Sequence, residues 1–584
     1  MWSPRLSAPF RRPAAALALS LALPLTATFA GDLPAVAVFA GPTATILNTD
    51  PPRTSRKARE KYGLPALRDW FGRPVTTDTL YYQRLAAPVT VYVDQFSAHP
   101  LEQDAAALFA PPDGYLDAQN VFHAERRSPA DRPVYEIVLQ PGDGLYPLPY
   151  MARRADGSAW EGSEGASGDF RQTFFPDAAR LFEELERSGS VLNGNLSARA
   201  RFSFFRAAPP GGYVHGLPAA RRTDQGAGDV PPEKAGVDFF PYGYANTYPP
   251  PAALAVITNA LQTALASGNF RGALWLEGSP RVEDTVYWLS LVIDTDALIV
   301  GTAAQRPNHR LSADGHQTVV DAVDFILSDA WRDESGHNRT GAVVIEDQQV
   351  FAAREVVKTA ARPGGFATLG GHGGVIGSTT GPTLTFLPNR RHGHTSEVRL
   401  TLLPVQLAGV RQGRDGRMTS VPVTVKDPDG KLRADAMPQV EGVDLSDWMT
   451  GTTGPDIAAA RRLVQEAVAR CAAQSPLIGL VAESVQGGHF DQGEVEALNA
   501  AALQGVPIVK AFRGANGGFV YSDPGNLLIE GSNLSSTKAR VLLMACLLRY
   551  GSLPIPADPS HPTPPELAAI RARLALYQAV FDTH

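Results

Sequence analysis

The sequence predicts an α/β fold in which helices cover both faces of a parallel sheet. The first observation is a set of short, continuous apolar runs, such as 273–276 (ALWL), 297–300 (ALIV) and 342–345 (AVVI). Runs of this kind are typical of strands that are buried on both faces. The second observation is that helical segments separate these runs, as expected for parallel strands joined by crossover helices.

The first strand and the first three crossover helices of this sheet can be assigned from the sequence. Residues 35–40 (AVAVFA) form a buried first strand, and Gly41-Pro42 supplies the turn after it. Helices are expected at 250–266, 283–293 and 315–327, and prolines open the first of them, which suits a first helical turn.

A second and smaller α/β unit follows near the end of the chain. Residues 383–433 between the two units predict β-hairpins, with turns at 414–416 and 427–430. The elements expected in the smaller unit are helix 457–473 capped by Asp456, strand 477–481, helix 493–503, strand 506–510 and helix 537–550.

These patterns divide the chain into an amino-terminal unit (31–385), a β-rich linker (386–440) and a carboxyl-terminal unit (441–584). Within the first unit, residues 53–239 have a different texture, with polar Gly/Pro-rich passages between expected strands at 89–93 and 134–139 and an expected helix at 178–187. An unstructured loop of this length is unusual inside a compact domain. We therefore expect an inserted subdomain there.

The first thirty residues have the features of a secretory signal peptide. Arginines precede a short apolar stretch at 14–25, and Thr28-Phe29-Ala30 forms a small-x-small cleavage site. The alternative is an uncleaved anchor, although the apolar stretch is short for a membrane span. We expect a periplasmic or secreted protein.

Composition excludes several other classes. The formal net charge is −6 and no long basic run is present, so neither a nucleic-acid partner nor a membrane partner is expected. The chain has two cysteines, Cys471 and Cys546, too few for a disulfide framework, and two buried thiols are favoured over a bridge.

Two segments carry a family resemblance. The first, at about 246–377, contains VEDTVYWLSLVIDTDALIVGTAAQRPNHRLSADG and VVIEDQQVFAAREVVKT. The second, at 479–548, contains GLVAESVQGGHFDQGEVEALNAAALQGVPIVKAFRG and EGSNLSSTKARVLLMACLL. Both resemble bacterial L-asparaginases and glutaminases. The resemblance implies a larger flavodoxin-like amino-terminal domain, a smaller carboxyl-terminal α/β domain, a homotetramer or dimer, and no metal or organic cofactor.

The resemblance implies a hydroxyl nucleophile after the first strand, which here is Thr43 in the segment FAGPTA. The alternative is a structural threonine, since Pro42 stands where the family has a turn glycine. The family's second hydroxyl, in its His-Gly-Thr-Asp-Thr turn, corresponds to Ser279 in the segment EGSPR. Pro280 replaces the aspartate that binds the substrate ammonium group, and Glu277, Glu283 or Asp284 are possible substitutes.

Further site residues follow from the same resemblance. The active-site lysine corresponds to Lys358, for which a structural role is the alternative. Substrate contacts are expected from Gly278 and from Asn246 and Thr247, and a contact across a subunit interface from His489, unless His489 is an ordinary surface histidine.

Three functions remain open on the sequence alone. The first is an amidohydrolase that acts on the side-chain amide of asparagine or glutamine through a threonine acyl-enzyme. The second is a non-catalytic binding protein, favoured by Pro280 and by the absence of the family's acidic partner contact in 519–526. The third is a hydrolase whose substrate is shifted by the insertion.

Overall fold

The computed structural model describes the chain from Pro251 onward with few gaps, and shorter segments before it. The described residues are 33–40, 53–54, 73–74, 81–82, 89–93, 113–117, 121–139, 152–153, 196, 199–206, 251–279, 281–306, 312–362, 364–368, 373–445, 457–484, 489–512, 520 and 525–584.

The large sheet runs in the order β17-β16-β13-β12-β11-β10-β1-β9 within the described residues. From β9 to β12 all pairings are parallel, and in chain order these strands read 2-1-3-4-5, the flavodoxin-like order. The strands β13, β16 and β17 extend the sheet in antiparallel fashion. Their bounds are β1 (Ala35–Ala40), β9 (Arg201–Arg206), β10 (Gly272–Leu276), β11 (Leu298–Thr302), β12 (Val343–Glu346), β13 (Gln349–Ala352), β16 (Val375–Ser378) and β17 (Thr383–Leu384).

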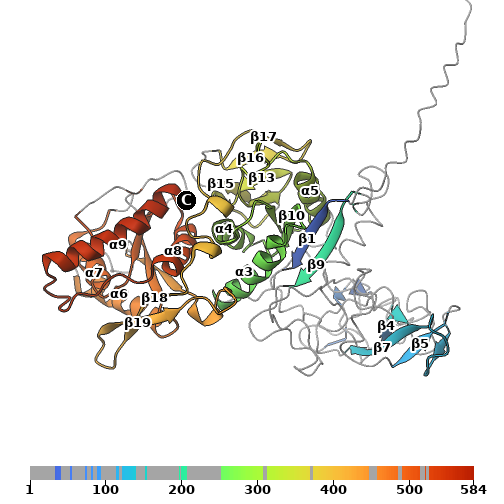
Figure 1. The fold of residues 1–584 in the computed structure, drawn as a ribbon, viewed down its shortest axis with the longest axis horizontal. Helices are drawn as coiled ribbons and strands as arrows, with labels where there is room; N and C mark the ends of the chain where they lie inside the picture. The colour runs from blue at the N-terminus through green and yellow to red at the C-terminus, as the bar shows by residue number, and fades with distance from the viewer. Residues whose placement is uncertain are drawn as a thin grey trace, which may run out of the picture. The chain divides into compact units, whose positions relative to one another are not determined.

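Helices cover both faces of this sheet, because the side chains of each strand alternate between the two faces. On one face, Phe39 and Trp275 pack with α3 (Pro251–Ala266) and α4 (Val282–Val292). On the other face, Val38 and Leu274 pack with α5 (Gly315–Leu327). Figure 1 shows α3 and α4 on the opposite side of β1 and β10 from α5. Each central strand therefore has two apolar faces, which confirms the α/β fold predicted from the continuous apolar runs.

Among the described residues, the segment 53–239 contributes to three sheets, the smallest of which is the antiparallel pair of β2 (Arg53–Thr54) and β3 (Tyr81–Tyr82). Its strand β9 pairs with β1 and so belongs to the large sheet. A separate antiparallel sheet runs in the order β6-β5-β7-β4-β8, while the helix expected at 178–187 lies outside the described residues. The bounds are β4 (Val89–Val93), β5 (Gly114–Leu116), β6 (Phe122–His123), β7 (Arg132–Leu139) and β8 (Ala152–Arg153).

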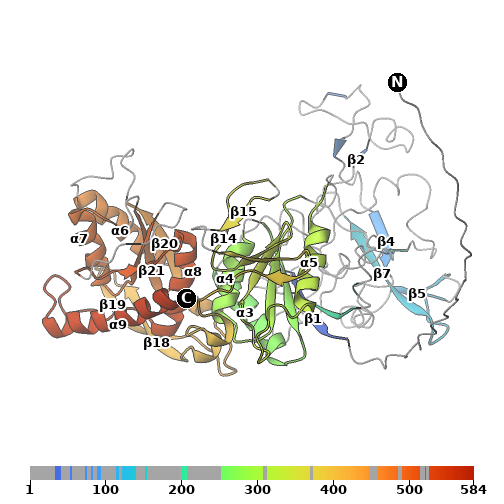
Figure 2. The ribbon, with the colours of Figure 1, turned by 90° about the horizontal axis from the view of Figure 1, so that it is seen from above.

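The second α/β unit is a parallel sheet in the order β20-β21-β22-β23. Helices α6 and α7 cover one face, and α8 and α9 cover the other (Figure 2). The bounds are β20 (Gln439–Asp444), α6 (Ile457–Ala472), β21 (Ile478–Ser484), α7 (Gln492–Ala502), β22 (Ile508–Phe512), β23 (Ile529–Glu530), α8 (Ser536–Tyr550) and α9 (Pro564–Thr583).

The passage between the two units contains the hairpin of β18 (Gln406–Gln412) and β19 (Met418–Thr424). Its turn includes Gly416 at φ +77°, a conformation that glycine adopts without steric cost. The residues at 383–384, expected in the same set of hairpins, instead form β17 of the large sheet.

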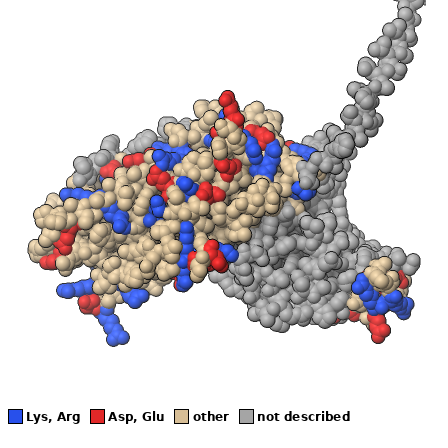
Figure 3. All heavy atoms as spheres, in the orientation of Figure 1, with Lys and Arg blue, Asp and Glu red and all other residues tan. Residues whose placement is uncertain are grey.

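One apolar core runs through both α/β units, because α4 and α8 contribute to the same buried cluster. Both Cys471 and Cys546 are buried and free, as the sequence favoured. Among the described residues, no helix has the length and apolar character needed to cross a membrane. On the face drawn in Figure 3, basic and acidic side chains are interspersed over the described surface.

Candidate active site

The candidate site lies at the carboxyl ends of the central parallel strands. Ala40, the last residue of β1, is paired with Leu276, the last residue of β10. The chain leaves β1 toward β9 on one side, and β10 lies on the other side, so the strand order reverses at this point. Open α/β sheets bind ligands at such switch points, outside the carboxyl ends of the strands.

A tight turn after β10 presents Ser279 at the start of α4. The main-chain oxygen of Gly278 accepts hydrogen bonds from the amides of Arg281 (2.9 Å) and Val282 (3.0 Å). Ser279 is 8% exposed, so its hydroxyl lies in a largely dry environment. Gly278 therefore has a clear structural role as the acceptor that closes this turn.

The structure brings Ser279 together with Lys358, the last residue of β14 (Val356–Lys358). The Lys358 Nζ donates a hydrogen bond to the Ser279 Oγ over 2.6 Å, although the two residues are 79 positions apart. The short hairpin of β14 with β15 (Phe366–Thr368) holds this lysine in place. Both residues were predicted as site residues from the sequence.

The surroundings of Lys358 favour loss of its proton. Burial lowers the pKa of the amine, and the charges of Glu346, Glu283 and Asp314 act in the opposite direction. A lysine with a lowered pKa has a larger neutral fraction near neutral pH, and only the neutral amine accepts a proton.

A buried carboxyl group, Glu346, is the last residue of β12 in the large sheet. It is 1% exposed and its Oε1 accepts a hydrogen bond from the Ala303 amide over 2.8 Å. Burial raises the pKa of Glu346 well above its usual range, so its carboxyl group favours the neutral form. A neutral carboxyl raises the pKa of Lys358 less than a carboxylate does. The pKa of Lys358 therefore stays lowered by burial.

A second carboxyl group, Glu283, contacts the lysine directly. Its Oε2 accepts a hydrogen bond from the main-chain amide of Lys358. Burial raises the pKa of Glu283 to about 7, although the charge of Lys538 acts in the opposite direction. At 8% exposure it differs from an ordinary solvated acid of an early helical turn.

The lysine of α8, Lys538, was missed by the sequence analysis. It is 1% exposed, and its Nζ donates hydrogen bonds to the main-chain oxygens of Glu283 (2.5 Å) and Ala353 (2.9 Å). The amine also lies 5.2 Å from the centre of the Tyr287 ring. The available signal was a lysine within the first turn of a strongly apolar helix, TKARVLLMACLL.

The other acid of the turn after β10, Glu277, is fully buried. Its Oε2 accepts a hydrogen bond from the Trp275 Nε1 over 2.6 Å. One carboxylate oxygen is therefore already engaged with a core side chain. This weakens the expectation that Glu277 replaces the missing ammonium-binding aspartate.

Of the remaining predicted site residues, the structure describes His489, which makes its hydrogen bond elsewhere. His489 is exposed in the segment after β21, where its main-chain oxygen accepts a hydrogen bond from the Ser484 Oγ over 2.6 Å. In the part of the chain that the structure describes, it makes no hydrogen bond with Ser279 or Lys358. Thr43, Asn246, Thr247 and Pro280 lie outside the described residues.

This arrangement can support proton transfer. A buried hydroxyl within hydrogen-bond distance of an amine of lowered pKa is the geometry of a hydroxyl and its general base. No described residue in this group forms a metal-binding cluster with the others; the His/Asp group found among the described residues lies elsewhere.

Comparisons with known proteins agree with the sequence resemblance. Residues 250–371 match the family model described as "Asparaginase, N-terminal". The glutaminase-asparaginase of Acinetobacter glutaminasificans is 33% identical over 87 residues, which cover 15% of this chain and 24% of that protein. The L-asparaginase 2 of Bacillus subtilis (strain 168) is 26% identical over 106 residues, covering 18% of this chain and 27% of that protein.

The chain therefore spans about a quarter of the length of the curated relatives it matches. Among solved structures, it matches the probable cytoplasmic L-asparaginase from Campylobacter jejuni with a TM-score of 0.44 and 17% identity. That match covers 70% of this chain and 94% of the solved one.

Proposed function

We propose that this chain, whose residues 250–371 match the family model described as "Asparaginase, N-terminal", is a divergent member of the asparaginase family that hydrolyses a side-chain amide and releases ammonia. Asparagine and glutamine are the substrates to test first, because the relatives are a glutaminase-asparaginase and an L-asparaginase. The observation that carries this proposal is the hydrogen bond between Lys358 and Ser279 at the carboxyl edge of the sheet.

The proposed nucleophile is the Oγ of Thr43. Ala40 and Leu276 are paired at the ends of β1 and β10, and Thr43 and Ser279 each follow their strand end by three residues. Two parallel strands with this register direct the residues that follow them toward the same edge. This supports a site in which two hydroxyl groups and one lysine act on one amide.

The proposed reaction has two steps. In the first, the Thr43 Oγ attacks the amide carbon, its proton passes to the Ser279–Lys358 pair, and the carbon–nitrogen bond breaks. Ammonia leaves after taking up a proton, and an ester on Thr43 remains. In the second, water attacks the ester carbon and releases the carboxylic acid and the free Thr43 hydroxyl.

Pro280 bears on the substrate. It stands where the related turn has an aspartate that binds an ammonium group, and proline has no side-chain acceptor. A substrate without a free ammonium group at that point would not need this acceptor. A related amide, admitted by the segment 53–239, is therefore the alternative substrate, and ligand binding without hydrolysis is the alternative function.

Export and assembly are separate parts of the proposal. The segment 1–30 supports cleavage of a signal peptide and a periplasmic or secreted location. The family resemblance supports a homo-oligomer, a tetramer or dimer. Amino-terminal sequencing of the protein recovered outside the cytoplasm tests the first, and light scattering after size exclusion tests the second.

Ammonia release by the purified mature protein tests the activity. Asparagine, glutamine and amides with a blocked amino group are compared, with Thr43→Ala and Ser279→Ala as variants. Each variant is expected to lower kcat by about 10²–10⁴-fold. Thr359→Ala is the matched control, because Thr359 is an exposed residue and, among the described residues, its hydroxyl donates to the Gly365 main-chain oxygen (3.0 Å).

The outcomes separate the three functions. Release of ammonia from asparagine or glutamine that both variants abolish supports the proposed reaction. Release of ammonia only from an amide with a blocked amino group would support hydrolysis of a substrate other than asparagine or glutamine. No release from any amide, with saturable binding of one of them, overturns hydrolysis in favour of a binding protein.

A further inference from the structure

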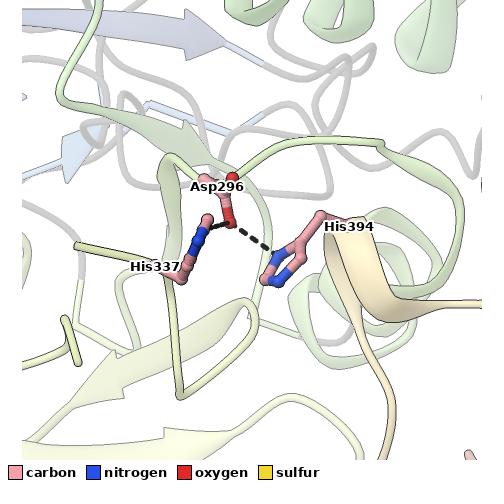
Figure 4. A group of neighbouring side chains, drawn as sticks. All are labelled: Asp296, His337 and His394. Atoms are coloured by element: carbon pink, nitrogen blue, oxygen red, sulfur yellow. Dashed lines mark ion pairs between the residues drawn. The ribbon is translucent and has the colours of Figure 1, made fainter. Parts of the chain in front are cut away.

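Three side chains with metal-binding chemistry meet near the amino ends of strands in the large sheet, opposite the candidate active site. Asp296 lies in the loop before β11, His337 in the loop before β12, and His394 in the 3-10 turn η10 (Gly393–Thr395). Figure 4 shows the two imidazole rings directed toward the Asp296 carboxylate. This group lies at the amino ends of the strands, whereas Ser279 follows a carboxyl end.

The three potential ligand atoms are close enough to share one ion. The Asp296 Oδ1 lies 2.7 Å from the His394 Nδ1 and 3.2 Å from the His337 Nδ1. One ligand atom from each residue lies within 4.8 Å of the others. Ligand atoms that share an ion through bonds of about 2 Å are separated by roughly 3 Å.

The contact between Asp296 and His394 has the distance of an ion pair without the geometry of a hydrogen bond. Its Nδ1 is buried and, among the described residues, has no hydrogen-bond partner despite the nearby carboxylate oxygen. Both histidines also direct a nitrogen at the same oxygen while their rings stack at 5.3 Å. One shared cation at this point would be coordinated by both nitrogens and by the carboxylate oxygen.

The loops that carry these side chains are held by local contacts. The Asp333 Oδ1 accepts a hydrogen bond from the His337 amide over 2.8 Å. Gly393 has φ +49°, and a Cβ at this position would lie 3.0 Å from the Thr295 main-chain oxygen. Glycine therefore permits the close approach that brings His394 next to the loop of Asp296.

We propose that Asp296, His337 and His394 form a binding site for one divalent transition-metal ion, with zinc as the first candidate. Two imidazole nitrogens and one carboxylate oxygen form a set that zinc accepts, and imidazole disfavours magnesium and calcium, which prefer oxygen ligands. The ion would join the loops before β11 and β12 to the segment at η10. This inference does not rest on the proposed hydrolytic activity.

The exposure of the ligands defines what kind of site this is. The side chains of Asp296, His337 and His394 are 45%, 54% and 29% exposed, so water has access to any remaining coordination position. A site with three protein ligands and open positions is expected to bind zinc reversibly. Its chemistry differs from that of a closed structural zinc site with four protein ligands.

Titration calorimetry with Zn²⁺ tests the site on the full-length mature protein, prepared without a histidine tag. We expect one equivalent of Zn²⁺ per chain and no comparable binding of Mg²⁺. His337→Ala and His394→Ala are each expected to weaken Zn²⁺ binding by tenfold or more, since even the loss of an outer-shell partner costs about 10–100-fold. Asp296→Asn is the isosteric variant, which removes the charge and keeps the shape.

His561→Ala is the matched control, because His561 Nδ1 lies 3.1 Å from the Asp558 carboxylate without a second histidine in the described group. It is expected to leave Zn²⁺ binding unchanged. Circular dichroism establishes that each variant is folded. The proposal is overturned if the protein binds no Zn²⁺, or if Zn²⁺ binding is the same after His337→Ala, His394→Ala and Asp296→Asn.

Discussion

Lys538 donates a hydrogen bond to the main-chain oxygen of Glu283 over 2.5 Å, although the two residues are 255 positions apart. Lys538 belongs to α8 of the second unit, and Glu283 belongs to the first turn of α4. The Glu283 carboxyl group in turn accepts a hydrogen bond from the amide of Lys358, whose amine contacts Ser279. The geometry of the candidate site is therefore linked to the packing of α8 on α4.

Replacing Lys538 by methionine is expected to destabilise the protein by about 2 kcal/mol or more. The buried carbonyl oxygens of Glu283 and Ala353 lose their donor, and each such loss costs about 1–3 kcal/mol. Urea unfolding followed by circular dichroism measures the change. The matched control is Arg540→Met on the same helix, where the side chain is exposed. Equal midpoints for Lys538→Met and the wild type would contradict the assigned role.

Lys358→Arg separates a base from a positive charge. Arginine keeps the charge and is not deprotonated in proteins, so it does not accept the hydroxyl proton. We expect kcat for ammonia release to fall by about 10²–10⁴-fold, as for loss of a general base. In the wild type the rate is expected to fall on acidification, because protonation of the Lys358 amine removes the base.

The control for that experiment is Lys431→Arg, a half-buried lysine near the turn at 427–430. It is expected to leave kcat unchanged. An active Lys358→Arg enzyme would mean that the site needs a cation at this position and that another group takes the proton.

Among the strands that the sequence predicted, the central strands of the large sheet have the simplest environment. The strands β10, β11 and β12 are buried on both faces, so their apolar runs are continuous and bounded. The strand β9 (RFSFFR) mixes polar and aromatic residues, and it was not predicted within the segment 53–239. The helix α9 was also missed, although Thr563 and Glu566 form a capping box at its first turn.

The sequence likewise predicted some residues of the candidate site and missed others. Ser279 and Lys358 were predicted because they lie in segments that resemble the active-site segments of L-asparaginases, where a hydroxyl and a lysine take part in nucleophilic chemistry. The role of Lys538 depends on contacts between segments far apart in the chain, which no local pattern contains. The cluster of Asp296, His337 and His394 was missed for the same reason, since its members come from three separate loops.

Glu283 is expected to make stability fall as the pH rises. Burial raises the pKa of Glu283 from 4.5 to about 7 in the folded protein, so the folded state binds the proton more tightly than the unfolded state. This contribution is fully present below pH 4.5 and is lost as the pH passes 7, and it amounts to at most about 3 kcal/mol.

Glu283→Gln isolates this effect, because glutamine has the shape of the neutral acid and does not titrate. The free energy of unfolding is measured in urea from pH 5 to pH 8 for both proteins. The difference between them should change over this range in favour of the variant. A constant difference would show that Glu283 has the same pKa in both states.

His584, unlike Glu283, is expected to make stability fall as the pH falls. Burial lowers its pKa from 6.5 to about 4, and its Nε2 accepts a hydrogen bond from the Glu397 amide over 2.9 Å. Protonation turns this acceptor into a donor that faces another donor. The folded state therefore binds the proton less tightly, and stability is complete above pH 6.5 and is lost as the pH falls through 4.

Urea unfolding between pH 7.5 and pH 4.5 tests this, with His584→Gln as the variant. The glutamine oxygen can accept the same hydrogen bond and does not titrate, so the variant should lose less stability on acidification, by up to about 3 kcal/mol. His561→Gln is the control, because the side chain of His561 is 86% exposed. If wild type and His584→Gln lose stability equally, protonation of the buried His584 acceptor that faces the Glu397 amide does not explain the acid sensitivity.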